Sequence, residues 1–465
     1  MKRIHFFLLC LLIAVPVFAQ ESNEPITVIG NELIGREENG APVREVIGNV
    51  ILRQGNVVIT CQRAIQYLTQ NNAKLIGNVV VTQDTLTIKT PEGYYFGNDR
   101  RAFSDKGVIL DDKKVLLTAI VGEYLFKENK AHFSKKVTLD DTSSVLTSED
   151  LMYFRRENKA IATKDVKIVD KEHTIWADSL IHLRQERITY GFNNIRIVTM
   201  NDGSTIWGDH IEDYRLKSYS LIDKNPLLMQ VDSVYNDAKT KLSSVDTLII
   251  KAKKMEAYRD TTNRFIAYDS VQIVRGGFAS RNEVTVYERN REKITTYKKE
   301  ENGVKPVLWY ENSQLTGDSI IVKLLNKKIN QIDVLGKGLV ISKNEKYPLR
   351  YDQIDGNRLK LWFADNQLQK TEVFDNVLSF YYMYDADAPN GIVKASALNA
   401  EIDFKDKKID KVKLFGDPKS EFHPELLVKG NEKKFLLPRF VLYTNKPVSS
   451  ELLKLKNAPI QEKKP

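Results

Sequence analysis

The sequence has very little cysteine and, after its first residues, no long hydrophobic run. Only 2 of its 465 residues are cysteines, which excludes a disulfide framework and any cysteine-rich metal site. No later stretch approaches the ~18 uninterrupted apolar residues of a membrane-spanning helix. A long basic block is also missing, and the net charge is only +9, so nucleic acid is not indicated as a partner. The 42% hydrophobic and 28% charged residues are well mixed, which is typical of a folded chain.

Residues 1–19 are expected to be a cleavable signal peptide. Two basic residues precede an apolar run over residues 6–15, and small residues end the segment at Ala19, as signal peptidase requires. The mature chain is therefore expected to be exported. Lipidation of Cys10 is the alternative, but it would leave almost no hydrophobic region before the cysteine.

Alternation of apolar and polar residues dominates the rest of the chain. Residues 79–90 alternate in this way and are followed by the turn residues Pro91-Glu-Gly93. Such runs between turns predict half-buried β-strands, and helical spacing is hard to find over any long window. The sequence therefore predicts an all-β fold.

The strands repeat at a step of 29 residues. Two apolar columns lie two residues apart, on one face of a strand: Val50, Val79, Val108, Val137, Val166 and Ile195, then Leu52, Val81, Leu110, Leu139, Ile168 and Ile197. A third apolar column, a small-residue column and an aromatic column follow: Ile59, Ile88, Leu117, Leu146 and Ile175; Ala73, Ala102, Ala131 and Ala160; Tyr95, Tyr124 and Tyr153. Self-similarity of this kind predicts stacked units that bury their apolar faces against their neighbours.

The repeat step divides the mature chain into segments. Residues 20–215 keep the 29-residue register, residues 216–304 form a less regular β connection, and residues 305–445 repeat at about 40 residues. Residues 446–465 are expected to be a flexible, solvated tail. The longer register shows in two columns: Leu324, Phe363 and Phe404, and Ile329, Leu368 and Ile409.

No residue pattern indicates catalysis or a metal. Cys61 falls in a column of small residues, Thr90, Ala119, Ser148 and Ala177, so a packing role is favoured over a nucleophile. The only candidate metal cluster is His173, Asp178, His182 and His210, but two of these histidines occupy repeat columns and no pair has usable ligand spacing. We expect neither an enzyme nor a cofactor.

Two further sets of residues have a structural explanation. Asp178, Asp209 and Asp318 recur one per unit, whereas glycosidases need two carboxylates at one bond, so turn or strand-end positions are favoured. The regularly spaced tyrosines are expected to form a packed ladder, with a stacking platform for bases or sugars as the alternative.

The repeated motifs resemble those of OstA-like, or LptA-like, lipopolysaccharide-transport proteins of the periplasm, with this chain a long member. The likeness is carried by Ile47-Gly-Asn-Val50, Ile76-Gly-Asn-Val79, Ile175-Trp-Ala-Asp-Ser-Leu180 and Leu315-Thr-Gly-Asp-Ser-Ile320, with the intervening tyrosines. It covers about residues 26–215 and returns over about 305–420. The resemblance implies an open β-jellyroll whose sheets clasp lipid A acyl chains, and pairing of edge strands with other members of the transport system.

The physical pattern is compatible with that role. An elongated, solenoid-like stack of repeated antiparallel strands with its apolar columns inward offers a slot that shields hydrocarbon. The residues expected to bind lipid there are Leu52, Val81, Leu110, Leu139 and Ile168, with Ile59, Ile88, Leu117 and Leu146 on the opposite side. An open terminal strand would admit another sheet, from a transport component at either membrane or from a second copy in a head-to-tail oligomer.

Three functions remain open from the sequence. The first is a periplasmic bridge that binds lipopolysaccharide through its acyl chains. The second is a structural β-solenoid scaffold or envelope-assembly protein with a dry core and no lipid cargo. The third, a polysaccharide-active β-helix enzyme, would need clustered acidic and basic residues on one face, which the columns do not contain. The sequence leaves open whether one continuous groove or two jellyrolls form.

Overall fold

The computed structural model describes residues 25–200, 203–235, 242–365, 367–386, 388–406 and 408–454. It divides into two compact units, Met1–Phe133 (unit 1) and Ser134–Pro465 (unit 2). The predicted signal peptide and Cys10 lie outside the described residues. The boundary between the units differs from the boundaries suggested by the repeat step, which remain a prediction about the register.

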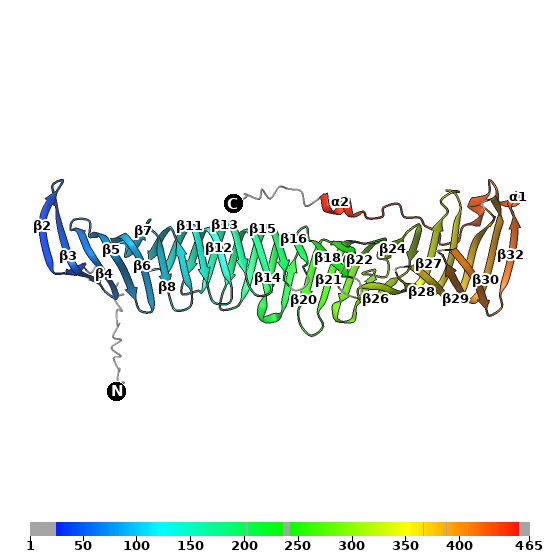
Figure 1. Ribbon diagram of the computed structural model, residues 1–465, viewed down its shortest axis with the longest axis horizontal. Helices are drawn as coiled ribbons and strands as arrows, with labels where there is room; N and C mark the ends of the chain where they lie inside the picture. Colours follow the sequence, from blue (N-terminus) through cyan, green and yellow to red (C-terminus); the bar gives the residue numbers. More distant parts are fainter. Residues whose placement is uncertain are drawn as a thin grey trace, which may run out of the picture. The chain divides into compact units, whose positions relative to one another are not determined.

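Unit 1 is built from short antiparallel strands that follow one another in space (Figure 1). They are β1 (Thr27–Ile29), β2 (Glu32–Glu38), β3 (Ala41–Gln54), β4 (Val57–Tyr67), β5 (Asn72–Gln83), β6 (Leu86–Phe96), β7 (Arg101–Ser104), β8 (Val108–Asp111), β9 (Leu116–Ala119) and β10 (Val121–Leu125), and β11 (Lys130–Asp140) begins here. Every pairing described within the unit is antiparallel.

Unit 2 continues the same pattern. Its strands are β12 (Val145–Phe154), β13 (Lys159–Val169), β14 (His173–Leu183), β15 (Ile188–Thr199), β16 (Thr205–Tyr214), β17 (Tyr219–Ile222), β18 (Leu227–Tyr235), β19 (Leu242–Lys251), β20 (Lys254–Tyr258), β21 (Arg264–Arg275), β22 (Phe278–Glu288), β23 (Lys293–Tyr297), β24 (Val307–Tyr310), β25 (Ser313–Thr316), β26 (Ser319–Leu325), β27 (Lys328–Lys343), β28 (Tyr351–Ala364), β29 (Gln367–Asp385), β30 (Ala388–Lys405), β31 (Lys408–Phe415) and β32 (Lys419–Pro424). Its short helices are η1 (Arg215–Lys217), η2 (Arg289–Arg291), α1 (Glu425–Val428), η3 (Glu432–Phe435) and α2 (Ser449–Lys454).

The all-β prediction and the stacked antiparallel repeat are confirmed. The 29-residue columns arise because each hairpin of two strands is one repeat, so equivalent residues lie two strands apart. The columns of the longer register are hairpin partners, as in Leu324 with Ile329 and Phe363 with Leu368. No helix in the described part of the chain is long and apolar enough to cross a membrane.

A pair of residues in the left-handed conformation bends many of the long strands near the middle. In β3 the pair is Gly48 and Asn49, and in β5 it is Gly77 and Asn78, all with positive φ. The pairing register shifts at the same points. Each bent strand thus contributes its two halves to two layers, which face each other across the apolar interior.

The bend at Gly77 requires a left-handed backbone. Its φ is +81°, and a Cβ there would lie 2.2 Å from Oε1 at the end of the Gln62 side chain, which would have to move. Lysines occupy the same bend position in later repeats, with φ of +66° at Lys135 and at Lys164. Glycine therefore lowers the conformational strain of this bend without being the one residue that can form it.

The end of the described chain crosses the strands of unit 2 instead of extending the ladder (Figure 1). We name residues 425–454 the C-terminal strap. Leu452 of α2 is only 4% exposed and packs in a cluster with Trp309 and Ile249. The expected solvated tail is therefore wrong for residues 446–454, because a single apolar side chain on a short helix is buried against the sheet; residues 455–465 lie outside the described part.

Two buried glutamines hold the backbone of the C-terminal strap. The Gln353 carboxamide donates to the carbonyl of Phe435 at 2.9 Å and accepts from the N–H of Leu437 at 2.8 Å. The Gln314 carboxamide holds residues 441 and 443 in the same way, at 2.8 Å each. Each side chain therefore acts as one rung of a β-ladder.

The bend predicts a stability difference between two glycine substitutions in unit 1. Gly77→Ala should lower the free energy of unfolding by about 2 kcal/mol, since it adds left-handed strain and a close contact. Gly35→Ala is the control, because nothing lies within 4 Å of its added Cβ and its φ is not positive. Urea unfolding followed by circular dichroism measures both, and equal stabilities would contradict the role of the bend.

Candidate functional site

An apolar ladder runs through the interior of each unit, one residue per strand. In unit 1 the cross-strand partners are, in order, Leu52, Ile59, Val81, Ile88, Leu110 and Leu117. In unit 2 the ladder joins Leu146, Ile168, Ile175 and Ile197. These side chains, together with Leu139, are all at most 5% exposed. All nine residues expected to bind lipid are therefore core residues in this structure.

One geometric expectation is wrong. Ile59 and Ile88 were expected opposite Leu52 and Val81, across a slot. The structure pairs Leu52 directly with Ile59 and Val81 directly with Ile88, on neighbouring strands. The two columns form one wall, because the 29-residue repeat is a hairpin and its two strands are hydrogen-bonded to each other.

The opposite wall of unit 1 contains aromatic and small side chains. Tyr95 and Tyr124 are each 1% exposed, and Ala73 and Ala102 pack beside Tyr95 on the adjoining strands. The rings of Tyr95 and Tyr124 both make edge contacts with Phe126. The tyrosines of this column are packed inside, not displayed as a stacking platform.

A small cavity remains between the two walls of unit 1. It is lined by ladder residues such as Val81 and Ile88 and by Ala102, Tyr124 and Phe133 from the facing layer. The space left for the centre of a water-sized sphere is about 20 Å³, roughly what a single water needs. The interior is apolar and nearly filled, so a hydrocarbon chain could enter only if the layers separated.

The rims of the two layers, on the side away from the bends, are joined by polar contacts. In unit 1 the Gln54 side chain donates to the carbonyl of Gly97 at 3.1 Å and accepts from the hydroxyl of Tyr95 at 2.6 Å. Arg100 donates to the side chain of Asn56 at 3.1 Å. These contacts join amide, phenol and guanidinium groups from opposite rims.

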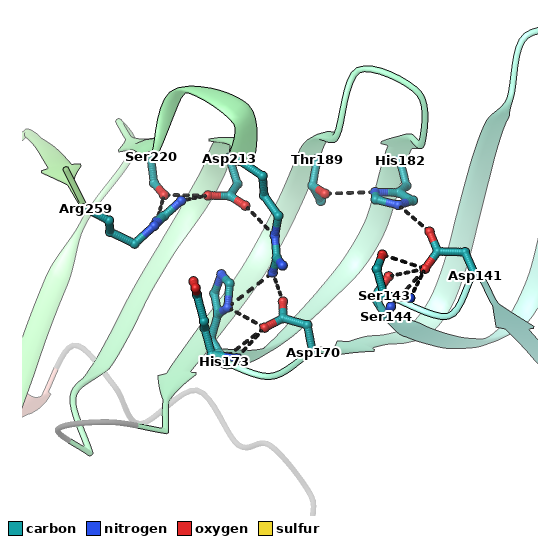
Figure 2. A network of polar contacts seen from close by, with 12 residues as sticks. Asp141, Ser143, Ser144, Asp170, His173, His182, Thr189, Asp213, Ser220 and Arg259 are labelled. Carbon is teal, nitrogen blue, oxygen red and sulfur yellow. Dashed lines mark hydrogen bonds and ion pairs between the residues drawn. The ribbon is translucent and has the colours of Figure 1, made fainter.

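In unit 2 the rims are joined by buried charges (Figure 2). We name this cluster the rim network; it consists of Asp141, Asp170, His173, His182, Arg184, Thr189, Asp213, Arg215, Ser220 and Arg259. The side chains of Asp141, Asp170 and Asp213 are 7%, 2% and 2% exposed. Ion pairs connect each of them to an arginine.

Local sequence places the first two carboxylates. Asp141 and Asp170 each begin a hairpin loop and accept hydrogen bonds from the backbone N–H groups two and three residues later, at 2.7 to 3.0 Å. This Asx-turn leaves the second oxygen of each carboxylate pointing into the rim. There Asp141 lies 3.5 Å from Arg184, and Asp170 is bonded to Arg215.

The third carboxylate is held from the strand side. Asp213 accepts from Arg259 at 2.7 Å and from the hydroxyl of Ser220 at 2.6 Å, and Arg215 lies 3.7 Å from its other oxygen. Arg215 thus connects Asp213 with Asp170. The network extends across several consecutive hairpins, as Figure 2 shows.

Burial and hydrogen bonding shift the acidities in the rim network. Burial alone would raise the pKa of Asp141, but hydrogen bonds from His182, Ser143 and Ser144 outweigh it and hold that pKa well below its usual range. Burial lowers the pKa of His173, which favours its neutral form. The lowered pKa keeps the Asp141 carboxylate ionised at neutral pH.

The other candidate residues have structural roles. Cys61 is buried, and burial raises the pKa of its thiol to about 11. Asp178 accepts from the amide of Asn194, and Asp209 from Asn225, each at 2.8 Å, beside a strand bend. Asp318 lies 3.3 Å from Lys298 and from Lys305. The expected turn or strand-end position is wrong for Asp178 and Asp209, which lie within β14 and β16 beside the bends, and agrees with Asp318, which lies between β25 and β26.

The histidines of the candidate metal cluster contact other groups. His182 bonds Thr189 and lies 3.6 Å from Asp141, while His210 bonds Asp223 at 2.6 Å. Among the described residues, no group of three His, Cys, Asp or Glu side chains could hold a metal ion.

Comparison with known proteins gives one family. Residues 28–178 match the family model described as OstA-like protein. The chain carries an OstA-like segment. The resemblance inferred from the sequence is thereby confirmed over this range, and its extension to the later repeat stays a prediction. No curated protein matches the chain.

One similar solved structure is LptH from Pseudomonas aeruginosa, whose title calls it the LptA homologous periplasmic component of the conserved lipopolysaccharide transport device. It is 13% identical, the match covers 32% of this chain and 96% of that chain, and the TM-score is 0.18. A likeness at this level adds no argument about function.

Sequence reasoning missed the rim network, although a signal was present. The tyrosine column continues as His182 and Asp213, and the small-residue column continues as Thr189 and Ser220, after steps of 29 and 31 residues. Polar residues replacing apolar ones in two columns at once indicate a buried polar cluster. The arginines come from loops, whose positions the apolar pattern does not constrain.

The environment of Cys61 predicts a slow reaction. At pH 8 the thiol of the folded protein, freed of residues 1–19, should react with iodoacetamide at least tenfold more slowly than in 8 M urea, because burial and the raised pKa both remove thiolate. Mass spectrometry counts the modified protein over time. Rapid modification of the folded chain would show that the bend region is open.

Asp141 predicts a dependence of stability on pH. Asp141→Asn should lower the free energy of unfolding by about 2 kcal/mol at pH 7, because it weakens hydrogen bonds to a buried charge. Since the folded-state pKa is depressed, this contribution is complete above the ordinary value of 3.8 and is lost as the pH falls toward the folded-state pKa. Urea unfolding at several pH values measures the difference in free energy of unfolding between the wild-type protein and the variant. A difference that grew in acid would contradict this assignment.

Proposed function

We propose that this protein is a periplasmic lipopolysaccharide-transport protein that shelters lipid A acyl chains between its two layers of strands. The observation that carries the proposal is the unbroken apolar ladder, present in an OstA-like segment. The protein acts by binding, without catalysis. Binding relies on the burial of hydrocarbon and needs no cofactor.

The ladder has the properties that such binding requires. Each acyl methylene moved from water into an apolar interior contributes about 0.8 kcal/mol. The contribution has no preferred direction, and successive rungs offer similar surroundings. An acyl chain can therefore move from one rung of the ladder to the next without being held in a deep free-energy minimum.

Binding requires the layers to separate, since the cavity beside Val81 is almost filled. The bends, with paired left-handed residues such as Gly77 and Asn78, form the side that stays joined. The rim on the other side of unit 1 includes amide, phenol and guanidinium contacts of Gln54, Tyr95 and Arg100, which water can replace, together with the buried carboxylate of Asp112. This rim of unit 1 is the proposed place of entry for acyl chains.

The outermost strands are the proposed docking points for other transport components. In unit 1, β1 and β2 each pair only with β3 among the described strands. In unit 2, β31 and β32 have described partners only in β30. Their outer edges offer the N–H and C=O groups to which a partner sheet, or a second copy of this chain, can add.

The filled interior favours one rival, a structural scaffold with a permanently dry core. A scaffold would contain the same buried contacts as a lipid-binding protein and would differ only in having no bound lipid. The two functions can therefore be distinguished by measuring lipid capture at a ladder position.

Photocrosslinking from the ladder tests the proposal. A benzophenone amino acid at Leu110, which is fully buried, should capture lipopolysaccharide when the protein is made in the periplasm of a lipopolysaccharide-producing host. The neighbouring Ile109 is 44% exposed on the outer face and is the matched control. Capture from position 110 should exceed capture from position 109 at least fivefold.

The same two variants also identify the scaffold. Equal or no capture at the two positions, with both proteins folded by circular dichroism, would contradict the proposed function. Native mass spectrometry of the unmodified protein would then be expected to show the mass of the chain without lipid.

A further inference from the structure

The columns that face the interior change character together in unit 2. Over β6, β10 and β12 the aromatic column holds Tyr95, Tyr124 and Tyr153. Over β14 and β16 the same column holds His182 and Asp213. The partner column changes in step, from alanine to Thr189 and Ser220. The change is coordinated, because each new polar residue bonds the one beside it.

Loop residues complete the change. Asp141 and Asp170 extend from one rim, while Arg184 and Arg215 extend from the other. Pairing between them ties the two rims together through groups that are largely buried. In unit 1 the corresponding side is joined by contacts of Gln54, Tyr95 and Arg100. It also contains one buried carboxylate, that of Asp112, in the same Asx-turn as Asp141; the interior column beside it still holds tyrosine, whereas in unit 2 it holds His182 and Asp213.

The charges within the rim network balance. The carboxylates of Asp141, Asp170 and Asp213 face the guanidinium groups of Arg184, Arg215 and Arg259. An anionic headgroup would therefore meet no excess of positive charge here and would have to displace a carboxylate. The arrangement suits closure of the rim better than binding of a phosphate.

Hydrocarbon is the kind of ligand that such a network of charges excludes most strongly. Water entering between separated rims can solvate ionised aspartate and arginine. An acyl chain entering there would leave the same ions against hydrocarbon without partners, which is among the most unfavourable forms of burial. The rim network therefore discriminates against an acyl chain even though Ile175 and Ile197 continue the apolar ladder beside it.

We propose that the rim network marks the limit of the acyl-chain path within unit 2 and keeps the interior closed from β14 to β20. This inference rests on the proposed lipid-binding function. It makes the network a determinant of how many rungs the lipid can use. The ladder residue Ile168 lies at the limit, and Ile197 lies beyond it.

Crosslinking on the two sides of the limit tests the inference. With the full mature chain in the same lipopolysaccharide-producing host, a benzophenone amino acid at Leu110 should capture lipopolysaccharide, and one at Ile197 at least tenfold less. Capture at neither position would overturn the proposed function and this inference with it. Equal capture at the two positions would support lipid binding and overturn the limit alone.

A variant keeps the shape of the network and removes part of its charge. Asp170→Asn combined with Arg215→Gln replaces an ion pair by amides, which are less costly to leave beside hydrocarbon. Capture from position 197 should rise at least threefold, while capture from position 110 stays within twofold. Circular dichroism and native mass spectrometry establish that the variant is folded.

The control removes an ion pair elsewhere in unit 2. Lys370 and Glu401 lie 2.9 Å apart, partly exposed to solvent, and Lys370→Gln with Glu401→Gln should leave both captures unchanged. An increase at position 197 in this control, or no increase in the folded Asp170→Asn, Arg215→Gln variant, would overturn the assignment of the limit to the rim network.

Discussion

The left-handed bend near the middle of the long strands is the constraint from which the rest of the structure follows. Two consecutive left-handed residues, as at Gly48 and Asn49, turn one strand into parts of two layers. Because hairpins repeat at a constant length through the first repeats, the bends line up along one side. The apolar ladder, the facing aromatic wall and the rim are all consequences of that alignment.

The rims of the two units share the hairpin geometry and differ in their polar groups. In unit 1 Gln54 and Tyr95 join the layers, with Arg100 and the buried Asp112 nearby, whereas in unit 2 ion pairs such as Asp170 with Arg215 do so. Buried ion pairs contribute little net stability compared with apolar packing, yet removal of one partner alone is strongly destabilising. Such a cluster is better explained by selectivity over what enters than by a need for stability.

Much of the fold could be predicted from the sequence because apolar residues recur at the period of the structural repeat. The column through Leu52 and Val81 marks true ladder positions, and the 29-residue step corresponds to one hairpin. The direct pairing of Leu52 with Ile59 on neighbouring strands could not be predicted. A repeat period gives the spacing of residues along the chain but does not say which of them are neighbours in a sheet. The pairing register supplied that information.

The site was less predictable for two physical reasons. Charged residues such as Arg215 belong to loops, where apolar periodicity gives no signal, and their partners lie up to 46 residues away. The burial of the C-terminal strap depends on single contacts, including those of Leu452 and Gln314, which a composition rich in lysine conceals. Long-range pairing of isolated residues leaves almost no pattern in one sequence.

The C-terminal strap has a consequence for folding cooperativity. Hairpins that touch only their neighbours behave as a nearly one-dimensional array, which can fray from an end. The bond from Tyr443 to Gln314 spans 129 residues, and that from Leu437 to Gln353 spans 84. These contacts connect the C-terminal strap to strands far from it in the sequence, which favours cooperative unfolding of the last hairpins of unit 2. The cost is a later folding step, since the strap can dock only after the strands beneath it have formed.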